Sequence, residues 1–385
     1  MTSKEELLGK ILSRIADELN ITDTMYKKAV SSYEAVGEWL GEGLDYSVRI
    51  MPQGSMNLGT VVRPLNDKDD YDIDLVCLLE DGKGLSARKV KTLVGDRLKE
   101  HEIYKDKLDE EGKRCWTMQY DEFHMDILPC IPRKDEFVQP GQTSIDLTDK
   151  NKKLDSYSFR PSDPAAFHDW FVDKARPLIA LANSRFAARA TEIKPVPSNA
   201  SEMKTPLQKA IQLLKRHRDV LFINDQKSAP ISVIITTLAA QACPHETNVY
   251  VALKTILERM EDFVGFRDGK YWVANPVMPE ENFAEKWNED ASKRLAFVNW
   301  CRRAYSDFVE ATASFEGLDE YSTHFREKLK PEPVDRAFKY FGESAREARE
   351  KGALRLVGLT AGLSTASASA GKAVAAHTFF GRCVE

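Results

Sequence analysis

The stretch QGSMNLGTVVRPLNDKDDYDIDLV, residues 53–76, decides the fold of this chain. It begins with a Gly-Ser turn and ends with two carboxylates, Asp72 and Asp74, within apolar, strand-like sequence. Because successive side chains of a strand point to opposite faces, the two carboxylates share one face, while Ile73 and Leu75 point toward a core. Two like charges on one face repel each other and cost stability unless a cation lies between them. The stretch therefore predicts a strand that presents acids to a cation.

A second strand-like stretch, FHMDILPCI (123–131), carries a third acid, Asp126, between apolar residues. On a neighbouring strand, this acid would complete an oxygen cage suited to Mg²⁺, which is usually held by a few carboxylates and by substrate phosphates. Two such ions suit a phosphoryl displacement, because they stabilise both the attacking and the leaving oxygen. The alternative is that the acids of residues 70–74 form a solvated edge after the polar loop NDKDD, and Asp126 argues against it.

The Gly-Ser turn before the first acidic strand has a composition suited to phosphate. Gly54 lets the backbone approach a ligand closely, and Ser55 offers both an N–H and a hydroxyl group. A Gly-Ser pair alone carries little information, because turns use it everywhere. Followed by the acidic strands, it predicts a corner that binds nucleotide phosphates next to the metal-binding acids.

The rest of the chain divides by its hydrophobic periodicity. Helical spacing of apolar residues is found in residues 3–20 and 22–40, strand-like segments dominate the next hundred residues, and helical patterns follow one another after about residue 164. This predicts an α+β lobe followed by a helical lobe. The predicted domains are bracing helices 1–44, an α+β core 45–163, a helical lobe 164–359 and a flexible, Ala/Ser/Thr/Gly-rich tail 360–385.

Composition narrows the class of protein. The chain has 385 residues, of which 42% are hydrophobic, so it is long enough to bury a substantial core. Six cysteines without paired spacing indicate reduced thiols, and the sequence has neither a signal peptide nor a membrane-spanning run, so we expect a cytoplasmic protein. A formal charge of −5 and the absence of a concentrated Lys/Arg platform argue against binding of long double-stranded DNA.

With these motifs in place, the chain resembles the DNA polymerase β-like nucleotidyltransferase superfamily. More closely, it resembles the bacterial cyclic GMP–AMP synthase-like enzymes known as CD-NTases. This resemblance implies a bilobed cage, in which a nucleotidyltransferase core and a helical C-terminal lobe enclose the active site in a cleft. The segments that carry it are QGSMNLGTVVRP (53–64), DYDIDLV (70–76), FHMDILPCIP (123–132), LQKAIQLLKRHRD (207–219), PISVIITTLA (230–239) and NPVMPEENFAEKW (275–287).

The resemblance implies the acids of the site. Asp72, Asp74 and Asp126 occupy the motif positions of the family's catalytic, metal-binding carboxylates. They would bind two Mg²⁺ ions, with Mn²⁺ as an alternative.

The resemblance also implies which residues bind the donor triphosphate. Gln53, Gly54 and Ser55 occupy the turn that holds it, and Lys215 and Ser232 best match a lysine and a serine of the helical lobe that reach the phosphates. The alternative for Lys215 is a basic surface formed by the run KRHRD.

For function, the resemblance implies synthesis of a cyclic oligonucleotide, most simply a cyclic dinucleotide, from triphosphates such as ATP and GTP, with pyrophosphate release. The product would be a second messenger that activates a separate effector in bacterial antiphage (CBASS) defence. Two alternatives stay open: a linear transferase that modifies RNA or a protein, and a non-catalytic nucleotide-binding protein. The sequence leaves open the bases, the linkage, the ring size, the activating signal and the oligomeric state.

The resemblance also implies a partner enzyme for the C-terminal tail. In many enzymes that this chain resembles, a ubiquitin-transfer-like enzyme conjugates the C-terminus to a target, and such tails end near a small residue. Here the chain continues past Gly381 to Glu385, so conjugation would require trimming, and an inert disordered end is the alternative.

Overall fold

A computed structural model gives the structure of the protein. The residues that it describes are 2–66, 70–133, 143–176, 192–193, 196, 204–243, 245–350, 355–357, 362–364 and 372–373. The chain divides into two compact units, Met1–Glu316 and Gly317–Glu385. The domain boundaries expected at residues 44, 163 and 359 stay predictions.

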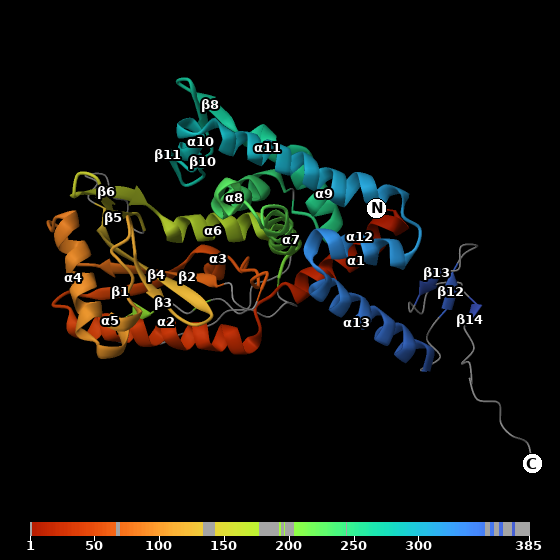
Figure 1. Cartoon of the computed structure of the whole chain (residues 1–385), viewed down its shortest axis with the longest axis horizontal. Coiled ribbons are helices and arrows are strands. Elements are labelled where there is room, and N and C mark those ends of the chain that lie inside the picture. Colours follow the sequence, from red (N-terminus) through yellow and green to blue (C-terminus); the bar gives the residue numbers. More distant parts are fainter. Residues whose placement is uncertain are drawn as a thin grey trace, which may run out of the picture. The chain divides into compact units, whose positions relative to one another are not determined.

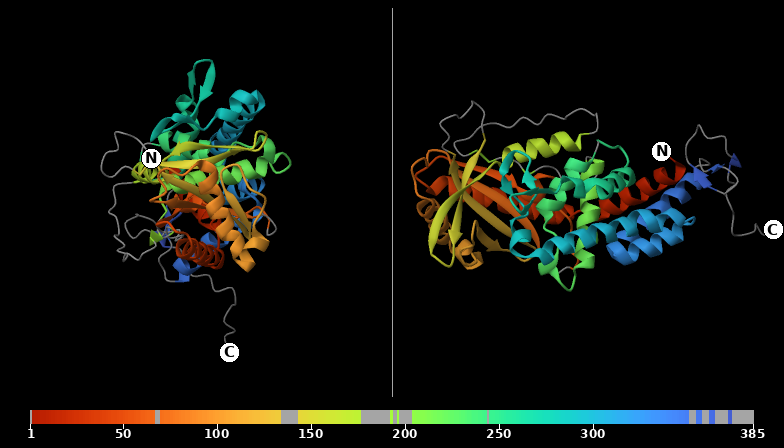
Figure 2. Two further views of the ribbon diagram at one scale, coloured as in Figure 1. Left: turned by 90° about the vertical axis from the view of Figure 1, so that its left-hand side faces the viewer. Right: turned by 90° about the horizontal axis from the view of Figure 1, so that it is seen from above.

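Two helices open the first unit. Helix α1 (Ser3–Glu18) begins at a capping box, in which Thr2 Oγ1 accepts from the Glu5 N–H at 3.2 Å and the Glu5 carboxylate accepts from the Thr2 N–H at 2.8 Å. Helix α2 (Asp23–Gly43) is capped by Thr22. Helix α1 packs on α7 (Pro206–Leu221) and α9 (Val249–Arg259), and α2 packs on the sheet and on α4 (Ala87–Glu100). The views in Figure 2 show α1, in red, beside the green helices of this unit.

A mixed sheet forms the α+β part of the first unit (Figure 1). The strand order is β6-β5-β4-β2-β1-β7, and β3 pairs with the free part of β4. Strands β2 and β4 run parallel, and so do β1 and β7. The remaining pairs, β1 with β2, β3 with β4, β4 with β5 and β5 with β6, are antiparallel. The strands are β1 (Val48–Gln53), β2 (Tyr71–Leu79), β3 (Trp116–Gln119), β4 (Phe123–Pro132), β5 (Ile145–Asn151), β6 (Ser156–Ser162) and β7 (Glu192–Ile193).

The two faces of this sheet have different roles. Helices α2 and α4 (Ala87–Glu100) cover one face, and Ile73 and Leu75 are buried there with Val90 and Val94 of α4. Burying these apolar side chains stabilises the packing of the strand on the helix, by about 25 cal/mol for each Å² of apolar surface removed from water. The acids of β2 therefore point to the other face, as the alternating pattern predicted. Two short helices, α3 (Gly54–Asn57) and α5 (Glu102–Lys107), complete this part.

The remainder of the first unit is mainly helical, but it is not the uninterrupted series of helices that was expected. Residues 265–282 form short strands, and the helix expected across residues 283–305 is broken at Asp290, whose side chain caps α11 through the Ser292 N–H. The elements are α6 (Pro164–Ala175), α7 (Pro206–Leu221), α8 (Ser232–Ala242), α9 (Val249–Arg259), β8 (Gly265–Arg267), β9 (Lys270–Trp272), β10 (Ala274–Asn275), β11 (Met278–Asn282), α10 (Glu285–Glu289) and α11 (Ala291–Tyr305).

The second unit holds α12 (Leu318–Leu329) and α13 (Pro331–Glu350), which pack on each other. Three short strands, β12 (Arg355–Val357), β13 (Gly362–Ser364) and β14 (Lys372–Ala373), pair around β12. The flexible tail expected over 360–385 lies outside the described residues, apart from β13 and β14. Among the described helices of the chain, none has the length and the apolar character needed to cross a membrane.

Candidate active site

The three acids singled out in the sequence lie on adjacent strands of the sheet. In the register of β2 and β4, Asp74 is directly opposite Asp126, and Asp72 is opposite His124. Because the strands are in register, all three carboxylates are on the face that α2 and α4 leave free. Asp72 and Asp74 line a cleft of about 1010 Å³ in the first unit. The register therefore brings the three acids together, with Asp72 and Asp74 at the wall of the cleft and Asp126 beside them, outside the lining.

The carboxylate of Asp126 is oriented by a neighbour that the sequence analysis missed. Thr117 of β3 is directly opposite Asp126, and its hydroxyl donates a hydrogen bond of 2.6 Å to Asp126 Oδ1. The bond fixes the orientation of the carboxylate beside Asp74. No sequence motif marks Thr117, because its role depends on the register of two strands.

Asp74 is the most electrostatically perturbed of the three acids. Its removal from water raises the pKa of the Asp74 carboxyl to about 7, and the neighbouring carboxylates of Asp126 and Asp72 act in the same direction. A carboxylate in this position is stabilised by any cation that binds between it and its neighbours.

The Gly-Ser turn packs directly on this acid. Gly54 has a positive φ of 67°, and a Cβ atom at this position would lie 1.8 Å from Asp74 Oδ2. Only glycine meets both conditions, the left-handed backbone and the close approach of the carboxylate. The sequence predicted a turn here, and the structure adds that it continues into the short helix α3.

Two polar residues beside Gly54 also line the cleft. Gln53 is opposite Asp74 in the register of β1 and β2, and its buried Oε1 has no hydrogen-bond partner among the described residues. A buried acceptor without a partner costs free energy, which a ligand donor or a cation would recover. Ser55 lines the same wall, and its carbonyl accepts from the Thr60 N–H at 2.9 Å, which closes the turn.

Lys215 of α7 reaches the cleft from the helical part. Its ammonium donates to the carbonyl and to the hydroxyl of Thr60, both at 3.2 Å, so the lysine is anchored at the end of the Gly-Ser turn. Burial, together with the nearby Arg218 guanidinium, lowers the pKa of Lys215 to about 7, although Asp72 and Asp74 act in the opposite direction. Because its side chain is buried, the solvated basic surface considered for KRHRD does not describe Lys215.

Ser232, the first residue of α8, lines the same cleft and is held by an arginine that the sequence analysis did not single out. Arg218 Nη1 donates to Ser232 Oγ at 2.9 Å and to the Pro230 carbonyl at 3.0 Å, while its other nitrogens contact Asp219. Arg218 lies three residues after Lys215, so both fall on one face of α7. This helical spacing is the sequence feature that could have placed Arg218 beside Lys215 at the cleft.

A further pair at the cleft was also missed. His124 Nε2 lies 3.0 Å from Asp70 Oδ2, and both residues line the cleft beside Asp72. His124 lies two residues before Asp126 on the same strand, so the alternating pattern puts both side chains on one face of the sheet. Its contact with Asp70 depends on the pairing of β2 with β4, which no local sequence pattern encodes.

The donor set suits a hard cation. Within the part of the chain that the structure describes, no three acidic, histidine or cysteine side chains form a ready-made metal site. The oxygen ligands are nevertheless adjacent: Asp74 is perturbed by both other acids, and Gln53 Oε1 is unpartnered. Mg²⁺ commonly binds through one or two carboxylates, with waters and substrate phosphates completing its shell. The residues therefore fit a cation that arrives with a triphosphate.

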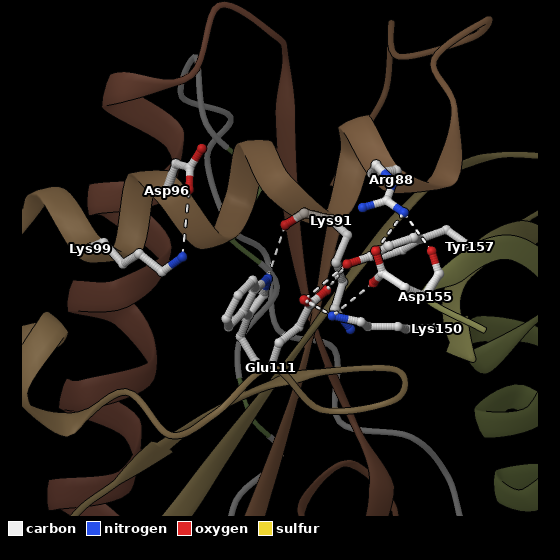
Figure 3. Close-up of polar contacts among 9 residues, drawn as sticks. Arg88, Lys91, Asp96, Lys99, Glu111, Lys150, Asp155 and Tyr157 are labelled. Carbon is white, nitrogen blue, oxygen red and sulfur yellow. Dashed lines mark hydrogen bonds and ion pairs between the residues drawn. The ribbon is translucent and has the colours of Figure 1, made fainter. Parts of the chain in front are cut away.

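The structure has a second concentration of charge on the α4 face of the sheet, away from the cleft (Figure 3). Glu111 accepts from Lys150 Nζ at 2.6 Å and from the Tyr157 hydroxyl at 2.9 Å. Next to them, the fully buried Lys91 ammonium has no hydrogen-bond partner among the described residues. None of these residues lines the cleft, so this cluster is not part of the candidate active site.

The chain is similar to known synthases of nucleotide second messengers. Residues 8–175 match the family described as "Second Messenger Oligonucleotide or Dinucleotide Synthetase domain". The chain is 26% identical over 358 residues to the c-di-GMP synthase of Roseivirga ehrenbergii, covering 90% of each chain. It is 25% identical over 401 residues to the cyclic dinucleotide synthase CdnG of Bradyrhizobium diazoefficiens, covering 97% of this chain and 94% of that protein.

Solved structures share the fold. The B. diazoefficiens CD-NTase CdnG in complex with GTP matches with a TM-score of 0.67 at 21% identity, covering 87% of this chain and 99% of that chain. The Escherichia coli CdnC:HORMA complex matches with a TM-score of 0.57 at 15% identity, with coverages of 86% and 99%. Vibrio cholerae DncV, bound to a linear intermediate, matches with a TM-score of 0.53 at 15% identity, with coverages of 87% and 88%. The predicted fold is confirmed.

Proposed function

We propose that the chain is a member of the CD-NTase family, and that it is a Mg²⁺-dependent nucleotidyltransferase that joins nucleoside triphosphates into a cyclic oligonucleotide, most simply a cyclic dinucleotide. The observation that carries the proposal is the register of β2 and β4, which puts Asp126 directly opposite Asp74, an acid that lines the cleft together with Lys215. The names of the two relatives, a c-di-GMP synthase and a cyclic dinucleotide synthase, support the reaction type.

In this proposal, the donor triphosphate lies along the Gly-Ser turn. Ser55 and Ser232 line the cleft from opposite parts of the first unit and offer hydroxyl donors to phosphate oxygens. Lys215 lines the same cleft and supplies positive charge. A bound triphosphate would favour the charged ammonium, because its negative charge raises the lysine pKa. Arg218 keeps the Ser232 hydroxyl in place and adds a second cation near the phosphates.

Asp72, Asp74 and Asp126 hold the cation in this proposal. Bound Mg²⁺ would supply Lewis-acid chemistry, lowering the pKa of the acceptor hydroxyl and neutralising the charge on the phosphates. The acceptor ribose oxygen forms a bond to the α-phosphorus, the bond from that phosphorus to the β-phosphate oxygen breaks, and pyrophosphate leaves while the hydroxyl proton passes to water. The chain's own contribution is to position both nucleotides in one cleft. A second transfer within the linear intermediate closes the ring.

The first test is pyrophosphate release from triphosphates with Mg²⁺, with Mn²⁺ and with EDTA. Release that requires the metal and that is lost in Asp74→Asn is expected. A protein that binds triphosphates but releases no pyrophosphate under any of these conditions would be a non-catalytic nucleotide-binding protein. A product transferred to RNA or to a protein would identify a linear transferase. The proposal includes a downstream role, in which the cyclic product activates a separate effector in antiphage signalling.

The C-terminal conjugation expected from the sequence stays a proposal, because residues 374–385 lie outside the described part of the chain. One of the structural neighbours is E. coli CdnC in complex with a HORMA protein. This neighbour supports testing whether this chain also binds a protein partner. Deleting residues 379–385 should leave pyrophosphate release unchanged, and loss of release would assign this segment to the enzyme itself.

A further inference from the structure

One wall of the cleft carries a carboxylate that no catalytic role uses. Glu281 of β11 lines the cleft and is half-buried. Its Oε2 accepts from the Asn275 side-chain amide at 2.8 Å, and within the described residues no Lys, Arg or His side chain forms an ion pair with it. The adjacent Glu280 is different: it is exposed, does not line the cleft and lies 3.8 Å from Arg133. A carboxylate that faces a cleft without a cation is available to accept hydrogen bonds from a ligand.

The strands around Glu281 hold this carboxylate in place. Asn275 is buried, and its Oδ1 accepts from the Val277 N–H at 3.1 Å, which fixes the direction of the amide that contacts Glu281. Asn282, the next residue, accepts through Oδ1 from the Val273 and Ala284 N–H groups, both at 2.9 Å. The residue after Glu281 and the amide that contacts Glu281 are therefore both held in place, which preorganises the Glu281 carboxylate.

An aromatic surface lies next to it. Phe283 and Phe167 both line the cleft, with ring centroids 6.2 Å apart and planes at 80°. Aromatic faces bind nucleobases by stacking, and such stacking is tolerant of base identity. Phe283 follows Glu281 by two residues, so the stacking surface and the carboxylate belong to one segment. Together they form a subsite with an apolar face and a negatively charged edge.

We propose that this subsite binds a guanine base and that Glu281 selects it; the inference rests on the proposed nucleotidyltransferase function. Guanine has two adjacent donors, N1–H and the 2-amino group, which match the two oxygens of a carboxylate in a charge-assisted pair. Adenine has an acceptor at N1 beside its 6-amino donor, so one carboxylate oxygen would face a lone pair. A site built around paired donors discriminates strongly against a ligand that lacks them.

The test is nucleotide binding by calorimetry, with non-hydrolysable GTP, ITP and ATP analogues, on the full chain. Wild type should prefer the GTP analogue over the ATP analogue by at least ~10-fold, and the ITP analogue, which lacks the 2-amino group, should bind less tightly than GTP. Glu281→Gln should weaken GTP binding at least ~10-fold and abolish the difference between GTP and ITP, because the amide replaces one acceptor with a donor. Glu280→Gln is the matched control and should bind like wild type.

The outcomes separate the inference from the proposed function, because binding is measured without turnover. A wild-type preference for the ATP analogue would overturn the guanine subsite, even if the enzyme makes a cyclic product. The same conclusion would follow if Glu281→Gln kept both the GTP affinity and the difference between GTP and ITP. Guanine selectivity lost in Glu281→Gln alone would support the subsite even if no pyrophosphate were released. Thermal melting of each variant checks that its fold is intact.

Discussion

The carboxylate of Asp74 packs directly against the Cα atom of Gly54, so closely that a Cβ on Gly54 would lie 1.8 Å from Asp74 Oδ2. Gly54→Ala must therefore displace either the acid or the turn. We expect turnover to fall at least ~10²-fold, since a displacement of about 1 Å can have this effect at a reacting centre. Steady-state pyrophosphate release measures it.

Gly269→Ala is the matched control for this substitution. Gly269 also has a positive φ, of 76°, but a Cβ there would meet no atom within 4 Å. Both variants carry the same kind of backbone strain, and only Gly54→Ala meets a carboxylate. Equal activity of the two variants would contradict the proposed role of the contact.

Asp74→Asn separates catalysis from stability. Turnover should fall at least ~10²-fold, because a charge is lost from the cation site. In metal-free buffer the variant should melt higher than wild type at pH 8. The folded-state pKa of Asp74, about 7, lies above its ordinary value of 3.8, so the folded state binds more protons and loses stability as the pH rises from about 4 to 7.

Thermal melting in EDTA at pH 5 and pH 8 measures this difference. The gap between variant and wild type should widen at pH 8, and Asp106→Asn, on the exposed side of α5, should show no gap. A variant that keeps near-normal turnover would remove Asp74 from the catalytic set.

Lys215→Met tests the binding of the triphosphate. Loss of one charge-assisted hydrogen bond should weaken the affinity for a non-hydrolysable triphosphate by about 1.5–3 kcal/mol. Lys209→Met is the control on the same helix: Lys209 Nζ contacts Asp17 at 2.7 Å and Ser13 at 3.0 Å and does not line the cleft. That change should lower the melting temperature and leave the affinity unchanged. The opposite pattern would move the phosphate contact from Lys215 to Lys209.

The buried ammonium of Lys91 predicts a stabilising substitution (Figure 3). Burial lowers the pKa of Lys91 from 10.5 to about 8, so between these values the unfolded state binds more protons, and stability rises with pH across that window. Lys91→Met should raise the free energy of unfolding at pH 7 by about 1–3 kcal/mol, because it removes a buried, unpartnered charge. Urea unfolding at pH 7 and pH 10 measures the effect.

The variant should also lose part of the increase in stability between pH 7 and pH 10. Lys99→Met, on the same helix, is the control: Lys99 is exposed and lies 3.6 Å from Asp96, so its removal should change stability little. A destabilised Lys91→Met protein would show that the ammonium has a favourable partner in solution.

The sequence predicted the features that depend on local periodicity. Alternation along β2 put Asp72 and Asp74 on one face and Ile73 on the other, and the structure confirms both placements. The short strands of residues 265–282 were not predicted, because segments of two to five residues carry too little periodicity to be distinguished from loops.

The contacts that complete the cleft depend on long-range packing, which no local pattern encodes. Lys215 contacts Thr60 across 155 positions of the chain, and Asp126 accepts from Thr117 only because β3 and β4 pair in one register. Glu281 looked like any acid in a polar run, and only its position in the cleft distinguishes it from Glu280.

The central claim is tested most directly by the stoichiometry of the reaction. The protein is incubated with α-labelled triphosphates and Mg²⁺, and the pyrophosphate released is counted in one portion of the reaction. A second portion is treated with phosphatase, and the nucleotide that stays in the resistant product is counted. We predict a phosphatase-resistant, protein-free product with one pyrophosphate released per incorporated nucleotide, since a closed ring has as many linkages as nucleotides. Product that is fully phosphatase-sensitive, with fewer pyrophosphates than nucleotides, would mean linear transfer and would contradict the account.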